Sequence, residues 1–146
     1  MTRIEIRVAI AKLAPRNHKG FTEADYLAKL KPGVDPWQQC LAALGLSWHR
    51  RCARGQPVEV PVVDFGSAML LLLPGESYVE FQLAAQRMRP NAFVMVAGYG
   101  EGGTGYVPTA KHWAEKDFNL NDWCWVHPGA EETLLKAITR GMREEK

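Results

Sequence analysis

The sequence predicts an α/β fold: a mixed sheet with a βαβ unit, a β-hairpin and flanking helices. Two observations carry this prediction. First, a segment of helical length separates the apolar runs at residues 68–73 and 92–97, which is the spacing of parallel strands joined by a right-handed crossover. Second, a strand-like segment at 57–65 precedes the first run across a turn at 66–67, as in a hairpin.

The N-terminal third is predicted to form one strand and two helices. Residues 3–10 alternate between apolar and mostly charged side chains, the period of a strand with one buried face. Thr22 caps a short helix, and residues 32–33 end it. Residues 35–36, Asp-Pro, begin a second helix that runs to about Arg54. Its expected apolar face consists of Trp37, Cys40, Leu41, Leu44 and Trp48.

The remaining elements follow from the same rules. Residues 69–73, MLLLL, show no polar alternation, as expected of a central strand covered on both faces. After a Pro-Gly turn, a helix is predicted from Glu76 to about Met88. A last amphipathic helix is expected over residues 128–143. Its inward residues are Leu134, Leu135, Ile138 and Met142.

Length and composition indicate one globular domain over residues 1–146, with 47% hydrophobic and 23% charged residues. The net charge of +2 gives no electrostatic case for nucleic acid or an anionic membrane as the main partner. Three cysteines without C-x-x-C spacing argue against a disulfide framework and a thiolate zinc cluster. We expect no signal peptide and no transmembrane segment, and the localisation stays undecided.

The stretch at residues 98–103, GYGEGG, has the G-x-G-x-x-G spacing of dinucleotide-binding loops. In those loops the pyrophosphate lies at the N-terminus of the helix that follows. Here the loop continues through GYVP, and Glu101 would place a carboxylate among the phosphates. Two other interpretations remain: a surface turn, or a tight loop that presents Tyr106. The glycines concerned are Gly98, Gly100, Gly103 and Gly105.

Glu76 and Tyr106 are the candidate site residues. They are expected at the C-terminal ends of neighbouring parallel strands, where open α/β sheets place their ligands. Two oxygen donors in one crevice suit a divalent metal or an acid–base pair. The alternative interpretation is that Glu76 is an acid in the first turn of a helix and Tyr106 an ordinary packing residue.

Three more residues are candidates for the surroundings of this crevice. Glu80, one turn after Glu76 on the predicted helix, is a candidate acid behind a metal ligand. Tyr99 is a candidate lining residue, and His112 follows Tyr106 closely enough in sequence to approach the crevice. The alternatives are a solvent-facing acid, strand-end packing and a histidine on a helix surface.

The segment LLLLPGESYVEFQLAAQRMRPNAFVMVAGYGEGGTGYVPT resembles the C-terminal part of the catalytic domain of neutral/alkaline non-lysosomal ceramidases, above all divergent bacterial members with PGE and a YGxxGxGY loop. The resemblance implies a zinc-dependent hydrolase of the N-acyl amide bond in ceramide-like lipids. It implies that Glu76, in PGE, and Tyr106, in GYV, are zinc ligands beside two histidines of the family. The family's H-x-H-S-G-type and H-G-T-S-type histidine stretches do not occur in this sequence.

The resemblance therefore implies an incomplete, half domain with part of a zinc site, inactive alone. Its expected partners are a missing N-terminal half or a second chain, and a lipid amide substrate. Family members are often exported. The alternative function is a non-catalytic α/β interaction domain on the same scaffold, and a homo-oligomer is one form that such a domain could take.

Overall fold

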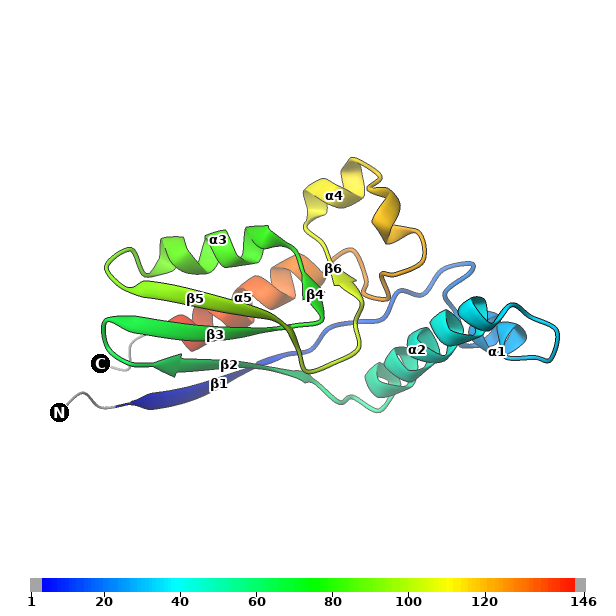
Figure 1. Ribbon diagram of the computed structural model, residues 1–146, viewed down its shortest axis with the longest axis horizontal. Coiled ribbons are helices and arrows are strands. Elements are labelled where there is room, and N and C mark those ends of the chain that lie inside the picture. Colours follow the sequence, from blue (N-terminus) through cyan, green and yellow to red (C-terminus); the bar gives the residue numbers. More distant parts are fainter. Residues whose placement is uncertain (1–3, 144–146) are drawn as a thin grey trace.

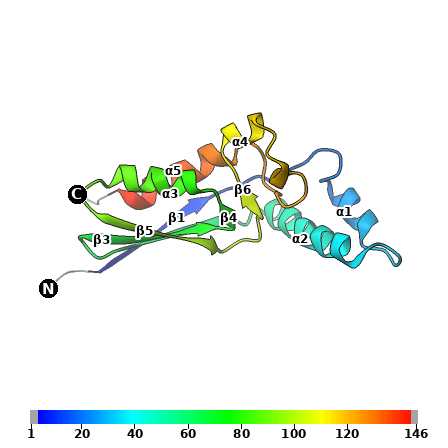
Figure 2. The same ribbon diagram turned by 45° about the horizontal axis from the view of Figure 1, so that its top comes forward.

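The computed structural model describes residues 4–143 of the chain. A four-stranded sheet in the order β1-β2-β3-β5 forms one layer, and helices α3 and α5 cover one of its faces (Figures 1 and 2). Helices α1 and α2 form a hairpin beyond one end of the sheet (Figure 1). The elements are β1 (Glu5–Ala11), α1 (Glu23–Lys29), α2 (Pro36–Ala53), β2 (Val58–Asp64), β3 (Ala68–Pro74), β4 (Glu76–Ser77), α3 (Val79–Met88), β5 (Phe93–Gly100), β6 (Tyr106–Val107), α4 (Ala110–Ala114), the 3-10 helix η1 (Phe118–Leu120) and α5 (Ala130–Met142).

The predicted hairpin and βαβ unit are both present, so the α/β fold class is confirmed. Strand β2 pairs antiparallel with β3, and the N–H of Phe65 donates to the carbonyl of Ala68 at the turn. Strand β3 pairs parallel with β5 after the chain crosses over through α3. Tight turns and apolar runs are local features, so sequence pattern was sufficient to find these elements.

Strand β1 has the predicted alternation, but its apolar side faces away from the helices. Ile6 is 68% exposed, whereas Ala9 and Ala11 are buried on the helix side. On that side the guanidinium of Arg7 bonds Asp64 and donates to the carbonyl of Gly141 in α5. The prediction of a buried apolar face was therefore wrong, because the helix layer takes the side with small residues and a satisfied arginine. Arg3 lies outside the described residues.

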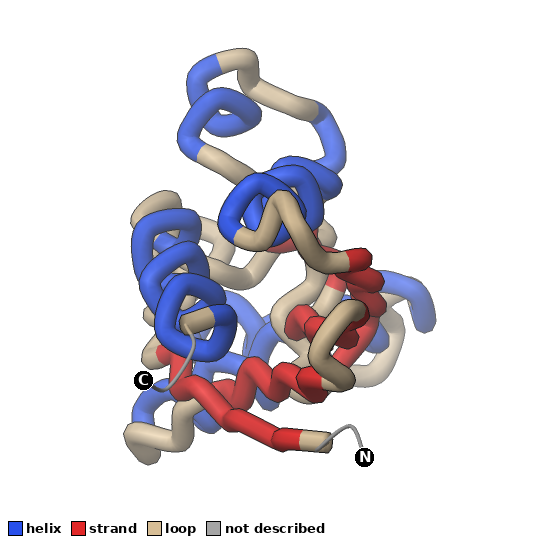
Figure 3. Tube along the Cα trace, turned by 90° about the vertical axis from the view of Figure 1, so that its left-hand side faces the viewer, coloured by secondary structure: helices blue, strands red, loops and turns tan. Residues whose placement is uncertain are grey.

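The central strand β3 is covered on one face by the helices of the described chain. Met69, Leu71 and Leu73 are fully buried, whereas Leu70 and Leu72 on the other face are only half-buried. Viewed end-on, the helices nearest the viewer lie to one side of the strands (Figure 3). The expectation that β3 is covered on both faces is thus wrong for residues 4–143. The side chains on the uncovered face, Leu70 and Leu72, are nevertheless apolar.

Helix α2 begins as predicted and buries a different face. Asp35 accepts hydrogen bonds from the backbone N–H groups of Trp37 and Gln38, each at 3.1 Å. Its buried residues are Leu41, Ala42, Gly45, Leu46 and Trp48, while Trp37, Cys40 and Leu44 are exposed. The prediction of a buried position was thus correct for Leu41 and Trp48 and wrong for the other three residues. The buried face of α2 is centred nearer Gly45, because α1 packs there through Tyr26.

The predicted helix at Glu76 begins three residues later, at Val79. Glu76 and Ser77 instead form β4, which pairs in parallel with β6. The N–H of Glu76 donates to the carbonyl of Gly105 at 3.0 Å, and that of Tyr78 to Val107 at 3.1 Å. These hydrogen bonds to a distant segment hold the backbone extended where local pattern favours a helix. The last helix matches prediction, with Leu134, Ile138 and Met142 buried and Leu135 half-buried.

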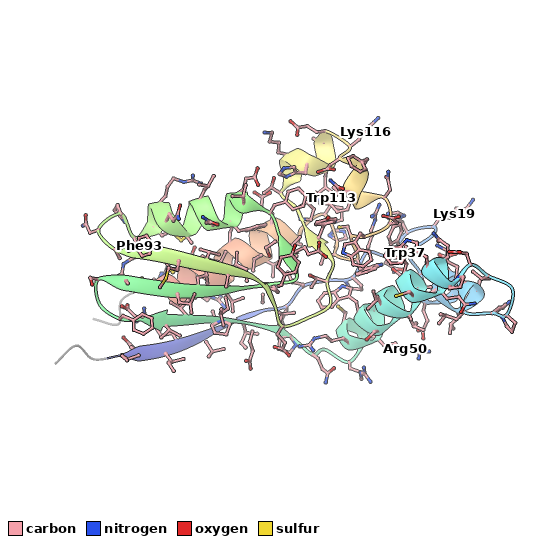
Figure 4. The ribbon with its side chains drawn as sticks, viewed as in Figure 1. Lys19, Trp37, Arg50, Phe93, Trp113 and Lys116 are labelled. Atoms are coloured by element: carbon pink, nitrogen blue, oxygen red, sulfur yellow. The ribbon has the colours of Figure 1, made fainter. Side chains whose placement is uncertain are left out.

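Helix α4 ends in a left-handed residue that is not glycine. Lys116 has φ 55°, its N–H donates to the carbonyl of Trp113, and the N–H of Asp117 donates to His112, a Schellman closure. Lys116 lies exposed at the outer end of α4 (Figure 4).

We expect Lys116→Gly to stabilise the chain by about 0.5–1 kcal/mol, because glycine adopts this conformation without strain from a Cβ. Urea unfolding followed by circular dichroism measures the change. Lys111→Gly, inside the same helix, is the control and should destabilise by about 0.5–1 kcal/mol. A loss of stability in Lys116→Gly would contradict the assignment of strain.

Candidate functional site

The small β4–β6 ladder brings Glu76 and Tyr106 together. They are direct partners in its parallel register, although thirty positions separate them in the sequence. Their side chains therefore leave neighbouring strands on the same side. The phenol of Tyr106 lies close enough to the carboxylate of Glu76 for the two groups to interact electrostatically.

Gly105 makes this arrangement possible. Its φ is +62°, and a Cβ there would overlap the carbonyl of Trp123 and lie 2.9 Å from the ring of Trp125. On either side of it the N–H of Tyr106 donates to Trp123, at 2.8 Å, and the N–H of Trp125 donates to Thr104, at 3.2 Å. The tight passage of the backbone at Gly105 thus fixes the position of Tyr106.

The other loop glycines have different surroundings. Gly98 and Gly100 belong to β5, and a Cβ on Gly100 would lie 2.7 Å from the carbonyl oxygen of Leu73. Gly103 borders open space. The G-x-G-x-x-G stretch leads into β6 and not into a helix, and Glu101 pairs with Arg51 at 3.1 Å. A dinucleotide loop needs a helix at this point, so that interpretation has no structural basis here.

Glu76 and Tyr106 open into a hollow of about 510 Å³ with aromatic walls. The indole N–H of Trp123 donates to the carboxylate of Glu76. Trp37 lies on α2 (Figure 4). Its ring stacks on that of Trp123, with ring centroids 5.7 Å apart and planes 11° from parallel. The complete lining is Trp37, Glu76, Tyr106, Phe118, Asn119, Asn121, Asp122 and Trp123.

The surroundings of Tyr106 favour its neutral form. Burial, and next the negative charge of Glu76, raise the pKa of the phenol above its ordinary value of 10.0. At neutral pH the tyrosine is therefore protonated and uncharged. A cation bound between the two oxygens would reverse this effect, because opposite charge stabilises a phenolate.

Behind Tyr106 lies a second polar cluster. Tyr78 packs edge-on against Tyr106 and donates a hydrogen bond to Asp117 at 2.8 Å. Its ring also packs against that of His112, with the ring centroids 4.3 Å apart. The other side of the His112 ring faces Glu80, with 3.5 Å between Nε2 and Oε1. Burial and the bond to Asp117 raise the pKa of Tyr78, and that same bond lowers the pKa of Asp117.

The structure changes the expected roles of three surrounding residues. Glu80 does not share a helix face with Glu76, because Glu76 precedes α3; it pairs with His112. The side chain of His112 is only 15% exposed and does not line the hollow; it contacts Tyr78, which in turn packs against Tyr106. Tyr99 is 81% exposed, has φ 58°, and does not line the hollow.

Sequence reasoning missed most of the wall opposite Glu76. Trp37, Phe118 and Asp122 come from a helix, a 3-10 helix and a loop that only the fold brings together. One signal was available: an aromatic residue on the first turn of α2, far from the helix's buried seam, suggests a partner elsewhere. Phe118, 76% exposed, has no such sequence signal.

Within residues 4–143 no group of three or more His, Cys, Asp or Glu side chains is arranged to hold a metal. Glu76 and Tyr106 supply two oxygen donors, whereas zinc usually takes four ligands. The donor pair thus fits part of a zinc coordination sphere. Among the described helices, none has the length and apolar character that a bilayer crossing requires.

Two solved structures share this fold. Neutral ceramidase from Pseudomonas aeruginosa is 15% identical with a TM-score of 0.61, and the match covers 96% of this chain and 28% of that chain. A ceramidase complexed with C2 is 15% identical with a TM-score of 0.58, and the match covers 96% of this chain and 30% of that chain. The chain thus has a ceramidase-like fold and spans less than a third of those chains. No family model and no curated protein matches it.

Proposed function

We propose that this chain is the portion of a ceramidase-like, zinc-dependent amide hydrolase that contributes Glu76 and Tyr106 to the metal site. The observation that carries the proposal is their direct pairing in the β4–β6 ladder, facing a hollow with aromatic walls. The ceramidase-like fold supports it, because both motifs behind the resemblance lie on these two strands.

Each of the chain's own residues has a definite task in this proposal. Trp123 holds the Glu76 carboxylate in place through its indole N–H, and Gly105 fixes the backbone at Tyr106. The stacked indoles of Trp37 and Trp123 offer a flat apolar wall for the acyl chain of a lipid amide. Zinc, when bound, polarises a carbonyl and activates water for hydrolysis.

The remaining zinc ligands come from outside the described chain, from a missing N-terminal half or a second chain. Two oxygens alone bind zinc weakly and leave no group to deliver a proton or place the scissile bond. We therefore expect the isolated chain to bind zinc without hydrolysing a lipid amide.

Calorimetric zinc titration of the chain tests this function. We expect weak binding by the wild type, and a loss of at least about tenfold in affinity for both Glu76→Gln and Tyr106→Phe, since each removes one ligand. An ultraviolet pH titration should show one tyrosine ionising at lower pH when zinc is present. Tyr106→Phe should abolish that change.

Glu101→Gln and Tyr99→Phe are the matched controls, because they make the same chemical changes outside the hollow. They should bind zinc as the wild type does, and circular dichroism should show all variants folded. Absence of zinc binding, or equal affinity in all variants, would overturn the metal-site role of Glu76 and Tyr106.

One observation favours a second candidate function, the non-catalytic interaction domain. The sheet exposes an apolar face that the helices of the described chain do not cover. A monomeric soluble protein rarely exposes a contiguous apolar patch of more than a few hundred Å².

A further inference from the structure

The sheet face opposite α3 and α5 is apolar from edge to edge. One complete cross-strand row consists of Ile6, Val63, Leu70 and Met95, which are paired in register across all four strands. Rows on either side add Val8, Pro61, Leu72 and Ala97, and Ala68 with Phe93. Ile4 and Ile10 extend the same side of β1. We call this surface the open face.

The exposures show that the open face is a real surface and not a shallow part of the core. Ile6 is 68% exposed, Phe93 70% and Ile4 60%. Phe93 lies at the end of β5 far from α2 (Figure 4). Within the described strands, Glu59, which pairs with Ile10 next to these rows, is the one charged residue on this side of the sheet. Large apolar side chains placed in water at so many adjacent positions indicate a surface that another layer covers.

The orientation of β1 is firmly held, so the open face does not result from a slipped register. A one-residue slip would turn every side chain over. Here the pairing runs through seven residue pairs from Glu5–Asp64 to Ala11–Val58. On the helix side, Arg7 bonds Asp64 at 2.8 Å and the Gly141 carbonyl at 2.9 Å, both partly buried. These contacts hold the side of β1 that carries Arg7 toward α5.

We propose that a second copy of this chain covers the open face, giving a two-fold dimer in which two sheets pack face to face between outer helices. Its extent fits: the large apolar residues Ile4, Ile6, Val8, Ile10, Phe93 and Met95 of the open face are each between 39% and 70% exposed. A standard-size stable interface takes about 800 Å² from each partner. Such a contribution would be roughly a tenth of the chain's 8647 Å² of accessible surface.

The composition of the open face also fits a second copy. Two equally twisted sheets pack with their strands about 30° apart, so an apolar sheet face is complementary to itself. Lys12 and Glu59 place opposite charges at one end, leaving an apolar centre with a polar rim. The carboxylate of Glu59, opposite Ile10, would be repelled by an anionic lipid surface.

Sedimentation velocity over a range of concentrations tests the dimer. We expect wild-type chain to associate to a dimer, and Ile6→Glu to weaken association at least about a hundredfold, because the two-fold axis buries the new carboxylate twice without a partner. Ile6 is exposed in the single chain, so Ile6→Glu should remain folded. Phe93→Glu, at the far edge of the open face, is the second variant.

Leu83→Glu is the matched control, because Leu83 is an exposed apolar residue of α3, on the helix side. It should dimerise as the wild type does. A chain that stays monomeric at every concentration would overturn the proposal. So would equal weakening by Ile6→Glu and Leu83→Glu, or a monomer that co-sediments with phosphatidylcholine–phosphatidylglycerol vesicles. Zinc is not involved, so this result is independent of the metal-site test.

Discussion

Gly105→Ala is expected to destabilise the chain by about 3 kcal/mol and to displace Tyr106 from Glu76. A side chain at φ +62° costs about 1–2 kcal/mol by itself. The added methyl group would also overlap the carbonyl of Trp123, whose oxygen accepts the hydrogen bond of the Tyr106 N–H. Backbone atoms cannot rotate away as a flexible side chain can, so relief requires moving β6.

Urea unfolding measures the loss, and zinc titration measures the consequence for the site. Gly103→Ala is the matched control: it changes the same residue type two positions earlier, where a Cβ meets open space and φ is not positive. Its stability should change by no more than about 0.5 kcal/mol. If both variants were equally stable, Gly105 would not be the residue that fixes the position of Tyr106.

Asp64→Ala is expected to cost about 2 kcal/mol at pH 7, because the partly buried guanidinium of Arg7 loses its carboxylate partner across the sheet and keeps Glu5, at 2.8 Å, as an ion-pair partner. The Arg7 and Asp64 side chains are only 11% and 12% exposed, and the ion pair measures 2.8 Å. The Arg50–Glu23 pair has the same length, but its side chains are 51% and 43% exposed. Glu23→Ala is therefore the control, with an expected cost below about 1 kcal/mol.

The cost of Asp64→Ala should depend on pH. Burial by itself would raise the pKa of Asp64, but bonds from Arg7 and the Gly66 N–H and the charge of Arg7 outweigh it, so the pKa lies below 3.8. A depressed pKa stabilises the fold above the unfolded value, and that stability is lost as pH falls through the folded value. Urea unfolding at pH 7 and in acid should show the gap between variant and wild type shrinking below about pH 3.8. A constant gap would contradict this origin.

Short-range pattern predicted the elements whose signals are local. The hairpin around Gly66 and the apolar strands on either side of α3 are encoded within a few residues of each other, and they occur as predicted. The start of α3 was wrong because hydrogen bonds to Gly105 and Val107 compete with the helix, and those partners lie about thirty residues away. Local propensity does not contain that competition.

The candidate site divides in the same way. The motifs containing Glu76 and Tyr106 were visible in the sequence, since a glycine-rich loop and a Pro-Gly turn are local signals. The wall of Trp37, Phe118 and Asp122 was not, because three segments without a shared motif meet there. Their convergence depends on the packing of α2 against the 118–125 segment.

By itself the sequence determined the period of each element, the positions of its turns and the two motifs of the site. Only the tertiary structure decided which side of β1 faces the helices. Alternation separates Ile6 from Arg7 but assigns neither to the interior. The helix layer settles this, because α5 packs on β1 on the side where Ala9 and Ala11 are buried, and Arg7 is satisfied there by the Gly141 carbonyl of α5 and by Asp64 of β2. The isoleucines are thereby left on the open face.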